Sequence, residues 1–215
     1  IFVQVTVETT GTLLVGPDIA AAATVIDALD VPLIGLNCAT GPQEMAEHVR
    51  YLAGSWRGLI SVQPNAGLPE LVDGRTHYPL GAAEMASWME RFVTEDGVNL
   101  IGGCCGTSTP HIQALDAMLR RHGGASHRPV PVPRKPVWVP SVASLYGATA
   151  LRQENAYFSI GERCNANGSK AWRERQAAHD WDGCVAMGRE QVAEGSNSLD
   201  CLLYTSDAAD DLLCV

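Results

Sequence analysis

Hydrophobic residues in the first 123 positions follow two alternating patterns, short apolar runs and longer segments with helical spacing. The apolar runs predict β-strands at residues 3–7, 31–36, 59–62 and 98–101. The segments that follow them predict helices at residues 18–29, 42–53, 82–94 and 110–121, with Thr109 as an N-cap before Pro110. Gly54, Gly97 and Gly123 are expected to end three of these helices. Strand and helix in alternation predict a parallel sheet with right-handed crossovers, an α/β fold.

The number of repeats indicates how much of a fold is present. A closed (β/α)8 TIM barrel typically needs about 250 residues, so four units within residues 1–123 predict the C-terminal half of such a barrel. The sequence begins at Ile1, next to the first apolar run, and we expect the other half of the barrel to precede it. Half a barrel leaves strand edges open near Val5 and Leu100, so this chain by itself is expected to be inactive.

A change of composition follows the repeats. Residues 124–156 hold a series of prolines that favours extended chain, and we interpret them as an interdomain linker. A new strand is predicted at residues 157–160 and a helix at 181–194 that ends at Gly195, so residues 157–200 are interpreted as the start of a second TIM barrel. Residues 201–215 fit neither pattern. They are interpreted as a non-native tail, the alternative being a native acidic amphipathic segment.

Composition and charge exclude several classes of protein. The 215-residue chain is 46% hydrophobic, enough for a substantial core, and its net charge of −9 argues against a nucleic-acid partner. No apolar run approaches the roughly 20 residues that cross a bilayer, so no membrane association is expected. A signal peptide is absent and the seven cysteines show no disulfide framework, which favours a reducing, cytoplasmic location.

Three cysteines carry the clearest chemical signal. Cys38 ends the second apolar run, and the pair Cys104–Cys105 follows the fourth run between glycines, so all three sulfurs are expected at the carboxyl ends of parallel strands. Tetrahedral zinc with Zn–S bonds of about 2.3 Å places two sulfurs about 3.8 Å apart, a spacing that adjacent cysteines can reach. Three ligands leave a fourth position open, as in a catalytic zinc site. Buried cysteines that only pack, a disulfide, or a structural zinc module for protein interaction are the alternatives.

Other polar residues are expected at the same ends of the strands. Glu8, Asn37 and Asn65 could offer carboxylate and amide groups to a substrate bound at this edge. The alternative for the asparagines is loop capping and turn formation, which Asn performs routinely. Histidines 48, 77 and 111 are expected at the surface or in caps, because three cysteines already complete the protein's share of the metal ligands.

Four motifs together resemble those of the cobalamin-dependent methionine synthases. They are Gly-Leu-Asn-Cys-Ala-Thr-Gly-Pro at 35–42, Pro-Asn-Ala-Gly-Leu-Pro at 64–69, Gly-Gly-Cys-Cys-Gly-Thr at 102–107, and Ile-Gly-Glu-Arg-x-Asn-x-x-Gly-Ser-Lys at 160–170. The resemblance covers residues 1–200. It implies a zinc-dependent homocysteine-binding barrel with ligands Cys38, Cys104 and Cys105, followed by a pterin-binding barrel. It also implies 5-methyltetrahydrofolate as methyl donor and a cobalamin domain, outside this chain, that carries the methyl group to homocysteine.

The resemblance also implies a second site. Glu162 and Asn165 lie just after the predicted strand, where they would pair with a pterin ring, and Asp200 matches an acidic position at the end of a strand. Two residues depart from the family pattern, Cys164 in place of threonine and Trp172 in place of phenylalanine. The rival enzyme is a cobalamin-independent homocysteine S-methyltransferase fused to a folate-type domain, and a downstream Asp-x-His-x-x-Gly run in the intact gene would decide between the two.

Overall fold

The structure is a computed structural model that describes residues 1–123 and 131–203. It forms two compact units, Ile1–Ala148 and Thr149–Val215, and each is described separately. The predicted tail lies outside the described residues from position 204 onward, as does the predicted linker from 124 to 130.

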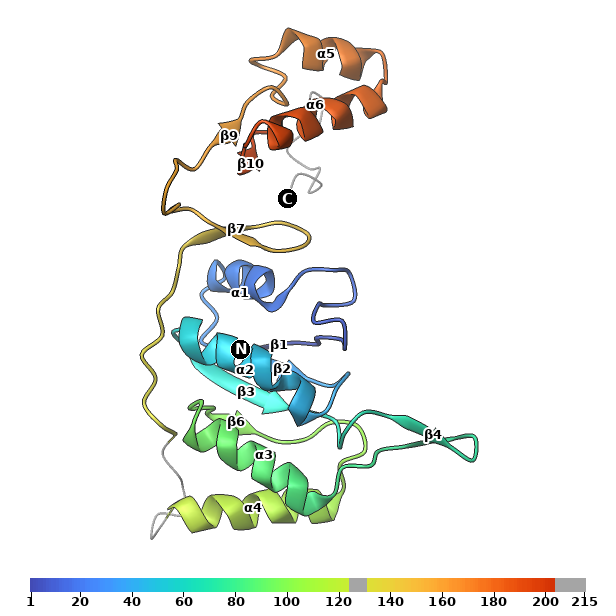
Figure 1. Cartoon of the computed structure of the whole chain (residues 1–215), viewed down its shortest axis with the longest axis vertical. Helices are drawn as coiled ribbons and strands as arrows, with labels where there is room; N and C mark the ends of the chain where they lie inside the picture. Colours follow the sequence, from blue (N-terminus) through green and yellow to red (C-terminus); the bar gives the residue numbers. More distant parts are fainter. Residues whose placement is uncertain (124–130, 204–215) are drawn as a thin grey trace. The chain divides into compact units, whose positions relative to one another are not determined.

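The first unit contains a four-stranded parallel sheet in the order β1-β2-β3-β6 (Figure 1). Its strands are β1 (Val3–Val5), β2 (Leu33–Asn37), β3 (Leu59–Gln63) and β6 (Leu100–Ile101). The helices that alternate with them are α1 (Ile19–Asp27), α2 (Pro42–Ser55), α3 (Ala82–Thr94) and α4 (Thr109–Gly123). This confirms the α/β class with a parallel sheet, and β1 and β6 are its outer strands, as predicted. Neighbouring strands follow chain order, as they do around a (β/α)8 barrel.

The two faces of the sheet differ in polarity. Buried side chains on one face, among them Ile34, Ile60 and Val62, pack against the helices in one hydrophobic core. The opposite face carries small and polar groups in register, where Gln4 Nε2 donates to Ser61 Oγ at 3.4 Å. Gly35 lies between them, and a Cβ there would be 2.8 Å from the Ser61 Cβ, closer than van der Waals contact allows. Glycine therefore permits the close approach of β2 and β3 at this layer.

Several predicted boundaries were wrong, and the hydrogen bonds give the reasons. The first strand ends at Val5, two residues early. The fourth begins at Leu100 because the Val98 N–H donates to Phe92 O at 3.0 Å, which ties Val98 to the end of α3. Gly54 does not end α2, which continues to Ser55. Thr109, predicted to precede a helix, is the first residue of α4, and Gly123 is the last.

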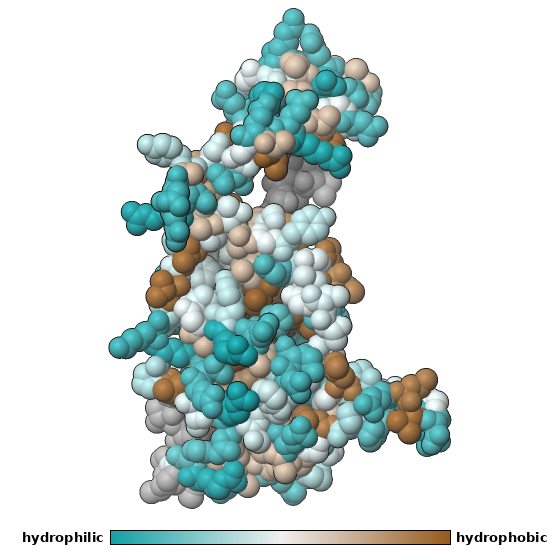
Figure 2. All heavy atoms as spheres, in the orientation of Figure 1, coloured by the Kyte–Doolittle hydropathy of each residue, from teal (hydrophilic) through white to brown (hydrophobic). Residues whose placement is uncertain are grey.

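A hairpin was missed entirely. Strands β4 (Glu70–Val72) and β5 (Arg75–His77) pair antiparallel in the connection between β3 and α3. The two residues of their turn both have positive φ, 49° at Asp73 and 73° at Gly74, and Asp-Gly is a strong hairpin signal. Leu71 and Val72 are exposed on this projecting hairpin, where hydrophobic side chains gather in Figure 2.

The proline-rich segment contacts the first unit. Residues 131–140 have no helix or strand, but Arg134 donates to the backbone oxygens of Trp56 (2.8 Å) and Gly58. The ring of Trp138 meets that of Trp56 edge-on at 6.0 Å between centroids. The predicted linker also contains a two-stranded sheet of β7 (Ser141–Ala143) and β8 (Ala148–Ala150), and β7 packs beside α1. Trp56 and Gly58 lie in the loop that leads into β3, and loops that lead into strands lie at the opposite end of the sheet from the cysteines. Residues 131–138 therefore run across that opposite end.

The second unit is a small α/β assembly. Its parallel strands are β9 (Ile160–Gly161) and β10 (Ser198–Leu199), and its helices are α5 (Lys170–Ala177) and α6 (Trp181–Ala193). The strand predicted at 157–160 begins only at Ile160. Helix α6 is confirmed, and Gly195 follows it with a φ of 102°. Helix α5 was missed, although Ser169 caps it by accepting from the Trp172 N–H at 3.2 Å. No helix among the described residues is long and apolar enough to span a membrane.

Candidate metal centre

Cys38 occupies the first position after β2, in an unusual backbone conformation. Its φ is 61° and that of Ala39 is 56°, both in the left-handed region that residues other than glycine rarely enter. The Cys38 N–H donates to Gln63 O at 3.1 Å, so the turn is held against the end of the neighbouring strand β3. Strain of this kind persists where the surrounding structure enforces it, and it occurs most often at functional sites.

Cys104 and Cys105 lie in the loop after β6 and are held against the loop after β3. The Cys104 N–H donates to Pro64 O at 2.8 Å, and the Cys105 N–H donates to the Asn65 side-chain oxygen at 3.0 Å. In return, the Ala66 N–H donates to Cys105 O at 2.9 Å. Three consecutive residues after β3 therefore fix the cysteine pair.

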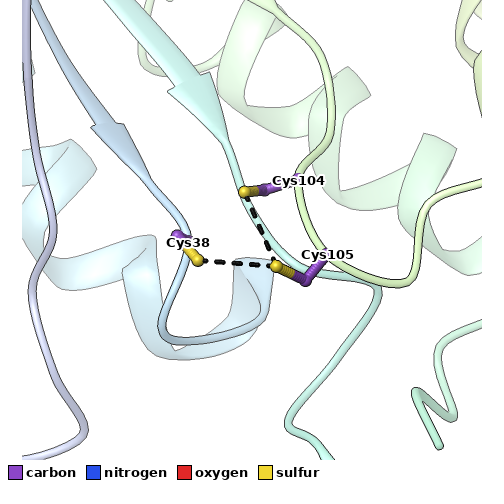
Figure 3. A group of neighbouring side chains, drawn as sticks. All are labelled: Cys38, Cys104 and Cys105. Atoms are coloured by element: carbon purple, nitrogen blue, oxygen red, sulfur yellow. Dashed lines mark hydrogen bonds between the residues drawn. The ribbon is translucent and has the colours of Figure 1, made fainter.

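The three sulfurs converge (Figure 3). Cys38 Sγ lies 3.7 Å from Cys105 Sγ, which lies 4.0 Å from Cys104 Sγ, and all three are within 4.8 Å of one another. These distances match the spacing of about 3.8 Å expected for sulfurs on one tetrahedral zinc. Within the described ranges it is the one group of three or more Cys, His, Asp or Glu side chains close enough to share an ion. Cys105 is exposed, so an additional ligand has access.

The thiols differ in acidity. Burial opposes ionisation of Cys38, but hydrogen bonds from the Ala39 N–H and from the thiols of Cys104 and Cys105 outweigh it and lower the pKa of Cys38. Burial, together with the hydrogen bond to Cys38 and its negative charge, raises the pKa of Cys104 to about 11. In the metal-free cluster Cys38 therefore ionises before Cys104, and the resulting thiolate is stabilised by its neighbours. This arrangement places negative charge where a soft cation would bind.

The structure also gives the surroundings of the other residues predicted for this site. Glu8 is half-buried, and its negative charge opposes ionisation of the Cys38 thiol. The Asn37 side-chain oxygen accepts from Thr6 Oγ1 at 3.4 Å, and that of buried Asn65 accepts from the Cys105 N–H. Both amide oxygens thus serve the protein's own loops, the alternative considered from the sequence. His111 is a capping residue, with Nδ1 3.2 Å from the Ser108 N–H and Nε2 2.9 Å from Leu80 O.

One neighbour of the cluster was not predicted. Tyr78 follows β5, and its ring lies against Gly106, the residue after Cys105, where a Cβ atom would overlap the Tyr78 Cγ. Burial, followed by the negative charge of Cys105, raises the pKa of Tyr78. The sequence around Tyr78 carries no recognisable signal, because its position depends on the hairpin between β4 and β5.

The residues predicted for the second site lie at the ends of the strands of the second unit. Asn165 Nδ2 donates to Asp200 Oδ2 at 2.8 Å, and the Asp200 N–H donates to Gly161 O at 2.8 Å, which holds it beside β9. The Asn165 oxygen accepts from the Asn167 N–H at 2.8 Å, and Glu162 is exposed. The parallel pair of strands therefore brings Asn165 and Asp200 into contact.

The first unit defines a class: parallel α/β proteins with a cluster of cysteine thiols at the carboxyl ends of the strands. The sequence model of the family described as "Homocysteine S-methyltransferase" matches residues 1–119. This is more than half of the 215 residues. The chain belongs to the homocysteine S-methyltransferase family.

Two relatives extend the similarity into the second unit. A protein named "Methionine synthase" from Mycobacterium leprae (strain TN) is 45% identical over 206 residues, which cover 95% of this chain and 17% of the relative. A protein of the same name from Mycobacterium tuberculosis (strain ATCC 25618 / H37Rv) is 45% identical over 205 residues, with the same coverage. The chain thus spans about a sixth of the length of the curated relatives it matches.

Proposed function

We propose that this chain is part of a methionine synthase that transfers a methyl group from 5-methyltetrahydrofolate, by way of cobalamin, to homocysteine. The observation that carries the proposal is the three-cysteine cluster, whose sulfur distances of 3.7 and 4.0 Å suit one tetrahedral ion. Identity of 45% to two methionine synthases over 95% of the chain supports it. In this proposal residues 1–123 are the C-terminal half of a homocysteine-binding barrel, 124–156 a linker, and 157–200 the start of a pterin-binding barrel.

Cys38, Cys104 and Cys105 would hold the zinc ion through their sulfurs. When bound, zinc supplies a site that favours the thiolate form of homocysteine at neutral pH, where a free thiol is mostly protonated. The hydrogen bonds that the Cys104 and Cys105 N–H groups donate to Pro64 O and to the Asn65 side-chain oxygen keep the cysteine pair in place, so the protein does not have to reorganise its ligands for each substrate. The exposed side of Cys105 is the access route for the substrate sulfur.

Glu8 and Asn37 would orient the amino-acid end of homocysteine. A half-buried carboxylate such as that of Glu8 is a suitable partner for the substrate ammonium group. Asn37 ends β2, one residue before Cys38, so its amide lies at the same end of the sheet as the cluster. Asn65 has a different part in this proposal, because its side-chain oxygen accepts from the Cys105 N–H.

The second unit would contribute to binding 5-methyltetrahydrofolate. Asn165 and Asp200 together present an amide and a carboxylate at one edge, and Glu162 adds a second carboxylate after β9. Alternating donors and acceptors of this kind match the edge of a pterin ring. A homocysteine S-methyltransferase without a folate-type domain would have no need for this site, and 45% identity to proteins named methionine synthase across both units supports the proposal.

The test compares cysteine variants of the full-length enzyme. Cys105→Ser should lose zinc and stop methionine formation from homocysteine and free methylcobalamin, because one of three ligands is gone. Cys184→Ser is the control, since Cys184 lies in α6 of the second unit and is not part of the cluster. Stoichiometric zinc together with normal methionine formation in Cys105→Ser would refute the proposed function.

A further inference from the structure

We propose that Gln191, in helix α6, is a positioning residue of the second site, whose buried amide fixes the loop after β9 that carries Glu162 and Asn165. The inference rests on the proposed function, because it takes these two residues to contact 5-methyltetrahydrofolate. It assigns a role to a side chain that has none in the methyl transfer described above.

Gln191 is buried but polar, and both ends of its amide bind the loop after β9. Only 3% of the residue is exposed. Its Oε1 accepts from the Arg163 N–H at 2.7 Å, and its Nε2 donates to Cys164 Sγ at 3.1 Å. Because a backbone N–H can only donate, the oxygen has to face Arg163 and the nitrogen Cys164. A primary amide supplies this acceptor and this donor together, whereas an ionised carboxylate only accepts and an apolar side chain does neither.

The end of β9 leaves room for this amide. A Cβ atom at Gly161 would be 2.7 Å from Gln191 Oε1 and 2.9 Å from Ser196 Oγ, closer than Cβ atoms normally approach. The φ of Gly161 is not positive, so the backbone itself does not require glycine there. The missing side chain at position 161 therefore serves the close approach of Gln191 to the strand.

The same loop is attached on its other side to the residues after β10. The Leu202 N–H donates to Cys164 O at 3.1 Å, and the Ala166 N–H donates to Leu202 O at 3.1 Å. Cys164 is thus held through its side chain by α6 and through its backbone by the segment that follows Asp200. Without the Gln191 amide, the Arg163 N–H loses its partner and the loop is held from one side only. Glu162 and Asn165 flank residues 163 and 164, so their orientation depends on this attachment.

The test uses the full-length enzyme and Gln191→Met, which keeps the length of the side chain and removes the amide. We expect the KM for 5-methyltetrahydrofolate in methylation of cob(I)alamin to rise about tenfold, a typical effect of leaving one buried donor unpaired. Methylation of homocysteine by free methylcobalamin should be unchanged. Hydrogen exchange of the peptide that spans residues 161–166 should become faster.

Met187→Ala is the matched control, because Met187 is a buried residue one turn earlier in α6. This variant weakens the packing of the same helix and leaves the Gln191 amide in place, so the KM for 5-methyltetrahydrofolate should stay near the wild-type value. Gly161→Ala is a second route to the same defect, since its methyl group would displace Gln191 Oε1. If Gln191→Met does not fold, Gly161→Ala carries the test.

The possible results separate the two proposals. If the wild-type enzyme methylates cob(I)alamin from 5-methyltetrahydrofolate but Gln191→Met matches it in KM and in hydrogen exchange, the role of Gln191 is refuted and the proposed function stands. If the wild-type enzyme does not use 5-methyltetrahydrofolate, both fail. An equal rise of KM in Met187→Ala would also refute the positioning role, because it would show that any loosening of α6 has this effect.

Discussion

Replacement of Gly106 by alanine tests how closely the hairpin and the cysteine loop fit together. At a φ of 77° an alanine pays for a left-handed backbone, a cost of roughly 1–2 kcal/mol. The new methyl group would also overlap the Tyr78 ring, and overpacking of this kind typically adds about 1–3 kcal/mol. We therefore expect Gly106→Ala to lower the free energy of unfolding by about 2–5 kcal/mol in total.

Gly74, in the turn of the hairpin between β4 and β5, provides a matched control. Its φ is 73°, close to that of Gly106, but a Cβ atom there would meet nothing within 4 Å. Gly74→Ala should therefore show only the backbone cost of roughly 1–2 kcal/mol. The difference between the two variants isolates the contact with the tyrosine ring. Because Gly106 adjoins Cys105, zinc affinity should fall in Gly106→Ala and not in Gly74→Ala.

The assay combines urea unfolding of the full-length enzyme with zinc competition. In the double variant Gly106→Ala/Tyr78→Ala the overlap with the ring atoms Cγ and Cδ2 is absent and only that with Cβ remains, so the stability losses should be less than additive. Equal destabilisation by Gly106→Ala and Gly74→Ala, with zinc affinity unchanged in both, would show that the ring does not rest on Gly106.

Two further predictions concern proton release and the second site. Zinc affinity should increase with pH, because Cys104, whose pKa is about 11, is protonated at neutral pH and must lose its proton to bind. The affinity should rise roughly tenfold per pH unit for each proton released. A chelator competition series from pH 6 to 8 measures this change. An affinity that is flat over this range would contradict the involvement of protonated thiols. Asn165→Ala should slow methylation of cob(I)alamin by 5-methyltetrahydrofolate, since it removes the amide beside Asp200. Methylation of homocysteine by free methylcobalamin should be spared. Equal losses in both half-reactions would indicate misfolding instead.

Much of the fold could be predicted because it depends on hydrophobic periodicity. Ile34 and Leu36 alternate with Gly35 along β2, and the helices repeat their apolar residues at the spacing of a buried face. The approach of the cysteines could be predicted for a related reason, since the carboxyl ends of parallel strands meet at one edge. Neither inference needs knowledge of individual contacts between side chains.

What could not be predicted depends on such contacts. The Pro-rich composition around residue 136 favours extended chain but does not show that Arg134 reaches the backbone of Trp56 and Gly58. The short strands of the missed sheet, Ser141–Ala143 and Ala148–Ala150, hold alanine and serine, which have low β propensity. The packing of Tyr78 against the cysteine loop requires the hairpin turn and a glycine 28 positions later, at residue 106, and these are joined only in three dimensions.

The arrangement of the cluster also bears on what metal binding contributes to the protein. The buried core of the first unit is built from strand and helix side chains such as Ile60, Met89 and Phe92, and the three cysteines are not part of it. The cysteine loops are held instead by hydrogen bonds from the cysteine N–H groups to the backbone oxygens of Gln63 and Pro64 and to the side-chain oxygen of Asn65. In domains that fold only around a structural metal, the ligands take the place of a core. Here a core and a ligand scaffold coexist, so zinc would add little to folding, and the strain at Cys38 and the exposure of Cys105 are explained by chemistry at the sulfurs.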